Sequence, residues 1–113
     1  IAISFRVIPT EVPPLEDLHL PELVKELAEL PRGLVLVTGH TGSGKSTTLA
    51  AMIGLINKKH TKRIVTLEDP IEYLFKSDKS IVIQPFIIGT PSTSFYSCIC
   101  NYRLILSFKI YVN

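Results

Sequence analysis

Cysteine is scarce in this chain of 113 residues, in which Cys98 and Cys100 form a single Cys-x-Cys pattern. The single spacer residue is shorter than the usual zinc or redox spacings, and no second cysteine pair follows. Long apolar runs are also missing, because no stretch approaches the roughly 20 residues of a membrane-spanning helix. We therefore expect no zinc site, no disulfide framework and no transmembrane segment, as is typical of a reduced cytosolic protein. The sequence also shows no basic and then apolar segment of the kind that forms a secretory signal.

Net charge is low as well, at +2, which is too small to indicate a nucleic acid or membrane partner. Four basic residues gather between positions 58 and 63, but no aromatic side chain for base stacking lies among them. We interpret them as a solvated helix end, so no nucleic acid partner is expected. With 46% hydrophobic and 19% charged residues, the composition indicates a globular domain or a piece of one.

A strand, a glycine-rich loop, a helix and a second strand are predicted in the middle of the chain. Residues 34–37 form a short apolar run, typical of a strand that is buried on both faces. A helix is predicted from Lys45, and the next buried strand at 64–67. The buried stripe of this helix consists of Leu49, Met52, Ile53 and Ile56. Strand, helix and strand in this order form one βαβ unit, which predicts an α/β protein with a parallel sheet.

Two further elements are predicted before this unit. Residues 1–8 have the composition of a short strand, and a proline-containing connector follows them. Pro21 suits the first turn of a helix that Pro31 and Gly33 end. The apolar stripe of this helix consists of Leu23, Val24, Leu27 and Leu30.

Residues 39–46 match the phosphate-binding P-loop, which needs glycine, four free positions and then Gly-Lys-Ser/Thr. Glycines let the backbone curl with its N–H groups inward, and the helix N-terminus behind the loop favours phosphate oxygens. Lys45 is expected to reach the β- and γ-phosphates, Ser46 to give its hydroxyl to Mg²⁺, and Thr47 to contact a phosphate. The sequence therefore predicts a site for ATP and Mg²⁺, with Ser46 as metal ligand. The nucleotide-binding residues are Gly39, Thr41, Gly42, Ser43, Gly44, Lys45, Ser46 and Thr47.

Three carboxylates, Glu68, Asp69 and Glu72, follow the predicted strand at 64–67. Ligands of open α/β sheets bind beyond the carboxyl ends of the strands, so these side chains are candidates for catalysis. One carboxylate can hold Mg²⁺ through water, and another can orient or deprotonate the attacking water. An apolar strand that ends in an acid also describes a Walker B strand, so the residues alone leave two roles open for Asp69.

Three stretches together resemble the ATPases of type II secretion and of type IV pili, and most of all the pilus retraction ATPases of twitching motility. They are residues 34–39, residues 41–52 and the sequence Glu-Asp-Pro-Ile-Glu-Tyr at 68–73. Residues 5–9 and 31–33 also resemble the segments that lead into this family's ATPase domain. The resemblance implies an incomplete RecA-like P-loop core at 21–82, an interdomain linker and the start of the ATPase domain at 1–20, and a divergent tail at 83–113.

The same resemblance implies roles and partners. Glu68, Asp69 and Glu72 fall in the family's Asp box, so the resemblance assigns Asp69 to the Asp box and not to a Walker B strand. Glu72 corresponds to the catalytic glutamate that polarises the water, and the other two support metal and water. The implied assembly is a homohexameric motor, cytoplasmic and peripheral at the inner membrane, that works with pilus or secretion machinery.

Departures from the family limit these expectations. His40 stands where the family usually has proline, and it is expected to be tolerated because the loop uses its backbone. The family's Walker B motif, His box and N-terminal arginines are not in this sequence. All ten acidic residues lie at or before Asp78, so residues 83–113 are interpreted as a frameshifted or degraded end. We therefore expect ATP binding with impaired hydrolysis; the alternatives are a non-catalytic nucleotide-binding fragment or a degraded product without independent function.

Overall fold

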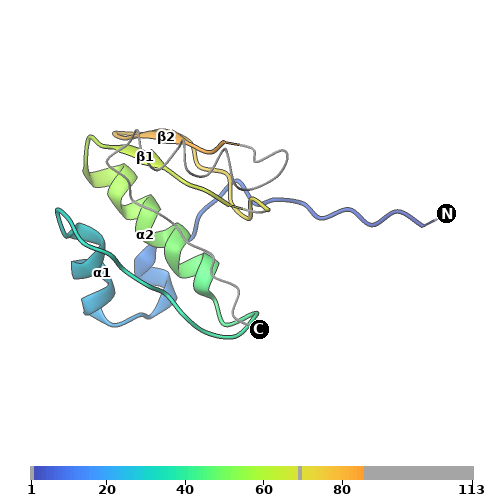
Figure 1. Ribbon diagram of the computed structural model, residues 1–113, viewed down its shortest axis with the longest axis horizontal. Coiled ribbons are helices and arrows are strands. Elements are labelled where there is room, and N and C mark those ends of the chain that lie inside the picture. The colour runs from blue at the N-terminus through green and yellow to red at the C-terminus, as the bar shows by residue number, and fades with distance from the viewer. Residues whose placement is uncertain (1, 69, 86–113) are drawn as a thin grey trace.

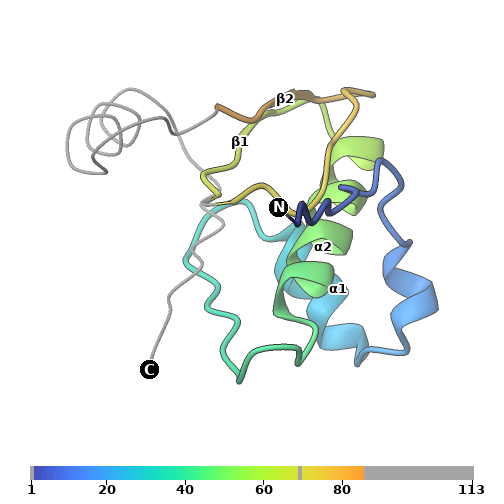
Figure 2. The ribbon, with the colours of Figure 1, turned by 90° about the vertical axis from the view of Figure 1, so that its right-hand side faces the viewer.

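A computed structural model describes residues 2–68 and 70–85 of the chain. One long helix, α2, lies between a small sheet on one side and two shorter helices on the other (Figures 1 and 2). In chain order the elements are the 3-10 helix η1 (Leu15–Leu18), α1 (Glu22–Glu29), α2 (Lys45–Lys59), β1 (Arg63–Val65) and β2 (Ile81–Ile83). The predicted α/β class is confirmed. Within the described part of the chain, no helix is both long and apolar enough to cross a membrane.

The sheet consists of β1 and β2, which run parallel with Ile64 opposite Val82. The amide of Thr66 donates to the carbonyl of Ile83 at 3.0 Å and extends the pairing past the end of β1. β1 confirms the strand predicted at 64–67, where Ile64, Val65 and Thr66 are almost fully buried. No strand is predicted at β2, because three residues are too few for a period of two to stand out. The predicted parallel sheet is therefore present, but the strand that pairs with β1 is β2 and not the segment at 34–37.

The strand predicted at residues 34–37 is wrong for this structure, in which these residues are extended but belong to no sheet. Val35 packs against the core, whereas Leu34 and Leu36 are 70% and 59% exposed. No backbone hydrogen bond joins this segment to another segment of the described residues. A strand exists only where a neighbouring strand takes its N–H and C=O groups, and local sequence does not show whether one is in place.

The strand predicted at residues 1–8 is also wrong over the part that the structure describes. Residues 2–8 form an extended arm that projects from the body (Figure 1). Phe5 and Val7 are 87% and 89% exposed, so these two side chains pack against almost nothing in the described chain, whereas Ile8, at the base of the arm, is 37% exposed. Alternating apolar residues are necessary for a half-buried strand, but they do not supply the surface that would bury it.

The core lies where α1, η1 and β1 meet α2. Met52, Ile53 and Ile56 are buried as the helical stripe predicts, whereas Leu49 is half-buried and lies at the site described below. The stripe predicted for α1 needs correction. The residues that face the core are Val24, Leu27 and Ala28, whereas Leu23 and Leu30 are 59% and 50% exposed. Positions i, i+3 and i+4 share one helix face, which explains why these three pack together.

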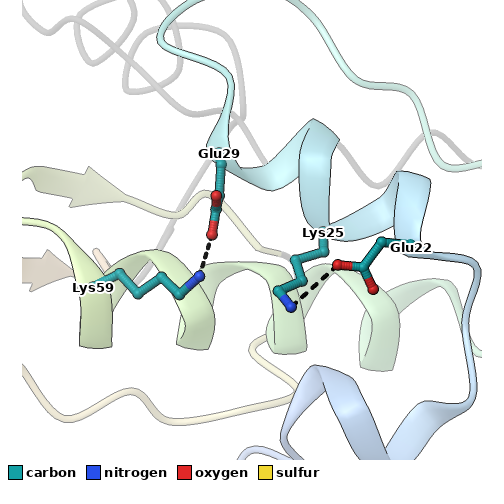
Figure 3. Close-up of polar contacts among 4 residues, drawn as sticks. All are labelled: Glu22, Lys25, Glu29 and Lys59. Carbon is teal, nitrogen blue, oxygen red and sulfur yellow. Dashed lines mark hydrogen bonds and ion pairs between the residues drawn. The ribbon is translucent and has the colours of Figure 1, made fainter.

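Two ion pairs involve α1 (Figure 3). Lys25 lies 3.2 Å from Glu22 one turn earlier on the same helix. Glu29, in the last turn of α1, pairs with Lys59 in the last turn of α2. The hydrogen bond from Lys59 holds the pKa of the Glu29 carboxyl below its usual value, and the bond to Glu22 raises the pKa of Lys25. The second pair therefore joins α1 to α2 at the surface of the core.

Candidate functional site

The predicted P-loop connects the extended segment before it to the first turn of α2. Gly44 has φ 86° and is the residue directly before the helix, a left-handed conformation that glycine adopts without steric cost. The amide of Thr48 then donates to the carbonyl of Gly44 at 2.9 Å and closes the first helical turn. The first amides of a helix have no partners within it, so the start of α2 offers N–H donors to an anion.

Lys45 closes the loop from inside. Its ammonium nitrogen, Nζ, donates to the carbonyl of Gly39 at 2.7 Å and to that of His40 at 2.6 Å. An ammonium group has three N–H donors, so one is left for a further acceptor. The side chain predicted to reach the phosphates therefore lies within the loop and also holds its two ends together.

Glycine suits position 39 because φ there is 155°, a backbone conformation that residues with a side chain rarely adopt. A Cβ atom there would also lie 2.6 Å from Oγ of Ser43, so the serine side chain would have to turn away. His40 points its Nδ1 toward the carbonyl of Thr41 at 2.8 Å and is exposed, which agrees with the expectation that the loop uses backbone at this position. The concave loop, its lysine and the helix start fit a phosphate group.

The acidic segment after β1 folds back on itself. The amide of Glu72 donates to Oε2 of Glu68 at 3.3 Å, and both carboxylates are half-buried. Ile71, between them, is buried and anchors the segment to the body. Asp69 lies outside the described residues, so its predicted part in metal or water binding stays a prediction.

A small cavity brings the two predicted regions together. Its lining includes Lys45 and Ser46 from the start of α2 and Glu68 and Glu72 from the acidic segment. It measures about 30 Å³, which is enough for one or two waters but far below the roughly 300 Å³ of a small-molecule pocket.

The donor set fits a hard cation only in part. Ser46 contributes a hydroxyl and Glu68 and Glu72 contribute carboxylates, which are the oxygen ligands that Mg²⁺ prefers. Within residues 2–68 and 70–85, no three His, Cys, Asp or Glu side chains form a metal-binding group. Mg²⁺ usually keeps several waters and binds through one or two carboxylates plus phosphates, so these residues suit it when a nucleotide is present.

Thr47 and Tyr73 form a contact that the sequence does not predict. Oγ1 of Thr47 lies 3.1 Å from the hydroxyl of Tyr73, which joins the first turn of α2 to the acidic segment. In this structure Thr47 therefore faces Tyr73, although the sequence assigns its hydroxyl to a phosphate. Tyr73 also lines the cavity, and its only sequence signal is its place in the 68–73 motif.

Gln84, directly after β2, is the second residue that sequence reasoning misses. Its amide nitrogen donates to the carbonyl of Tyr73 at 2.8 Å and to Oε1 of Glu68 at 3.3 Å. Its amide oxygen accepts from the amide of Phe75 at 2.8 Å.

Of the eight predicted nucleotide-binding residues, the four at positions 41–44 are exposed on the loop, while Lys45, Ser46 and Thr47 are half-buried.

This fold and loop define the class of P-loop ATPases. The chain belongs to the type II/IV secretion system protein family, whose model matches residues 15–94. That match confirms the resemblance drawn from the motifs. It also reaches twelve residues past position 82, into the segment 83–113 that lies almost wholly outside the described residues.

Individual relatives support the same family. The chain is 55% identical over 83 residues to a twitching motility protein of Neisseria gonorrhoeae, covering 74% of this chain and 22% of that protein. It is 52% identical over 80 residues to the type IV pilus retraction ATPase PilT of Pseudomonas aeruginosa, covering 71% and 23%. A crystal structure of the pilus retraction motor PilT with bound ADP is similar with a TM-score of 0.77 and 44% identity, covering 85% of this chain and 29% of that one. The chain thus spans about a quarter of the length of these relatives.

Proposed function

We propose that this chain binds ATP, with Mg²⁺, through the loop at 39–46 and the carboxylates that face it. The observation that carries the proposal is the shared cavity of Lys45, Ser46, Glu68 and Glu72, which joins a phosphate loop to acidic side chains. Bound ATP supplies the phosphoryl group and Mg²⁺ the positive charge that offsets its oxygens. The ADP bound in the similar PilT structure supports the same ligand class.

Residue roles follow from these positions. Lys45 keeps one N–H for a phosphate oxygen while it holds the loop closed. Ser46 lines the cavity and offers its hydroxyl there. Glu72 is proposed to polarise the attacking water, and Glu68 and Asp69 to support water and metal.

In the longer proteins of this family we propose that the segment is part of a motor for pilus retraction or for secretion. That motor is proposed to be a homohexamer that works with the pilus or secretion machinery, in the cytoplasm at the inner membrane. The names of the pilus relatives support retraction, and those of other relatives support type II secretion, among them a type II secretion system protein E of Aeromonas hydrophila.

Turnover by this chain alone is expected to be near background. Phosphoryl transfer depends on charged groups around the transferred phosphoryl group, and a single arginine can contribute 10³–10⁵ in rate. The Walker B motif, the His box and the family's N-terminal arginines are not in this sequence. Binding without efficient hydrolysis is therefore the activity that we propose for the chain by itself.

The test is nucleotide-dependent stabilisation of the purified chain. A ligand present at about 100 times its Kd stabilises a folded protein by about 2.7 kcal/mol, so MgATP and MgADP should raise the melting temperature by roughly 10 °C. Lys45→Ala should abolish this rise. Lys58→Ala, an exposed lysine at the far end of α2, is the matched control and should retain it.

Three results would contradict the proposal. No rise with the unchanged chain excludes nucleotide binding, and an equal rise with Lys45→Ala excludes the loop as its site. Robust hydrolysis by the chain alone that Lys45→Ala removes excludes the part of the proposal that concerns turnover. The alternative of a product without independent function predicts that the chain lacks a cooperative unfolding transition.

A further inference from the structure

The amide group of Gln84 has its bonds concentrated on the acidic segment. Both N–H donors and the carbonyl oxygen contact residues 68–75, through Glu68, Tyr73 and Phe75. Gln84 is half-buried, and all three bonds of its amide group go to this one eight-residue stretch. The geometry makes Gln84 a connection between the sheet and the segment that carries Glu68 and Glu72.

The carboxylate of Glu68 connects Gln84 to Glu72, the predicted catalytic residue. Oε1 of Glu68 accepts from Gln84, while Oε2 of the same carboxylate accepts from the amide of Glu72. Gln84 therefore orients Glu68, and Glu68 in turn fixes the backbone at Glu72. Outer residues that hold ligand side chains in place commonly change metal affinity by about 10- to 100-fold when they are replaced.

The sheet gives Gln84 a fixed position. It directly follows Ile83, whose carbonyl accepts from the amide of Thr66 at 3.0 Å. Thr66 is almost fully buried and lies only two residues before Glu68. The acidic segment is thus held at its start by the pairing of β1 with β2 and along its length by Gln84.

We propose that Gln84 is a positioning residue that sets Glu68 and Glu72 against Ser46 for metal-dependent nucleotide binding. This inference rests on the proposed function. Gln84 does not line the cavity of Ser46, Glu68 and Glu72, so it acts through the two carboxylates. Loss of its amide should affect the contribution of Mg²⁺ to nucleotide affinity and leave the metal-free contribution of the phosphate loop in place.

Asn57 supplies a matched comparison. It is buried in α2, donates to the carbonyl of Lys76 at 2.8 Å and accepts from the amide of Asp78 at 3.1 Å. It therefore secures the same connection between β1 and β2, but at the end away from the carboxylates and outside the cavity lining. Replacing Asn57 tests what general loosening of this connection does.

The experiment is a calorimetric titration of the whole chain with ADP, with Mg²⁺ and without it. The variants are Gln84→Ala, Gln84→Glu and Asn57→Ala. Gln84→Glu keeps the size and the acceptor for Phe75 but replaces the N–H donors with an oxygen that faces Glu68. Gln84 is half-buried and outside the core cluster, so both of its variants are expected to fold.

In the unchanged chain Mg²⁺ should strengthen ADP binding, and both Gln84 variants should reduce that enhancement by about tenfold. Their metal-free affinity should stay within about twofold of the unchanged chain. Asn57→Ala should keep the enhancement.

The inference is overturned if Mg²⁺ has no effect on the unchanged chain, if the Gln84 variants keep the enhancement, or if Asn57→Ala loses it equally. In the second and third cases ADP binding that persists leaves the proposed function standing, whereas in the first it leaves only the nucleotide-binding part and removes the part that concerns Mg²⁺. ADP binding that is absent from the unchanged chain overturns the proposed function itself, and this inference with it.

Discussion

The hydroxyl of Thr47 lies 3.1 Å from the hydroxyl of Tyr73, 26 residues further along the chain. This bond joins the residue after the Lys-Ser pair of the phosphate loop to the residue after Glu72. Either hydroxyl can be the donor in this contact, so Tyr73 can donate to Thr47 while Thr47 donates to a phosphate oxygen. The two halves of the candidate site are therefore coupled through a group that the nucleotide is expected to engage.

Tyr73→Phe and Thr47→Val should each lower the free energy of unfolding, and the double variant should lower it by less than their sum. One hydrogen bond typically contributes about 0.5–1.5 kcal/mol, so the coupling energy should lie in that range. Urea unfolding of the four proteins measures it. Strictly additive effects would show that the two hydroxyls do not interact in solution.

Gly39→Ala should weaken nucleotide binding because φ of 155° strains any residue with a side chain, and the added Cβ also displaces the hydroxyl of Ser43. Backbone strain of about 1–3 kcal/mol corresponds to a loss of roughly 5- to 150-fold in affinity, measured by titration with ADP. Gly54→Ala is the control, because its Cβ would meet Val12 at an ordinary 3.5 Å. In the interior of α2 that change should instead stabilise the chain by about 0.5–1 kcal/mol. Unchanged affinity in Gly39→Ala would contradict the loop geometry.

Replacing both Leu34 and Leu36 by serine should change the free energy of unfolding by only about 0.5 kcal/mol, because both side chains are largely exposed. Urea unfolding distinguishes this from the strand that the sequence predicts at 34–37. Burial in a sheet would make each change cost about 2–5 kcal/mol. Ile64→Val, in a fully buried position, serves as the reference and should cost about 0.5–1.5 kcal/mol.

Glu29 should make stability depend on pH in the acid range. The bond from Lys59 lowers the pKa of Glu29 in the folded chain, so its contribution is present above the unfolded pKa of about 4.3 and is lost as pH falls through the folded pKa. Glu29→Gln should flatten this part of the stability profile, measured by thermal unfolding from pH 6 down to about pH 3. Added salt should also reduce the effect, since both partners are exposed.

The helices and the phosphate loop could be predicted because their signals are local. Gly44 precedes α2, and the Lys-Ser pair begins it, as the motif requires. Met52, Ile53 and Ile56 face the core because a helix satisfies its own backbone and needs only one apolar face. The family could also be recognised, since three motifs occur in order.

The strands depended on partners that sequence periodicity does not identify. Residues 34–37 have the stronger apolar run, yet β2 at Ile81–Ile83 pairs with β1. Each strand requires another strand for its backbone groups, and the choice is made over distances of many residues. Tyr73 and Gln84 could not be predicted as site residues for the same reason, because their roles exist only through contacts with Thr47 and Glu68.

The sequence by itself determined the phosphate loop, the helix behind it and the family, because each depends on residue types at short, fixed spacing. Only the tertiary structure decided that Glu68 and Glu72 meet Ser46 in one cavity and that Gln84 and Tyr73 hold them there. The physical reason is that hydrogen bonds between distant segments form only after packing has brought those segments together. For Lys45 the sequence and the structure each supply one part: its position in the motif predicts a phosphate ligand, and the fold shows that it also closes the loop.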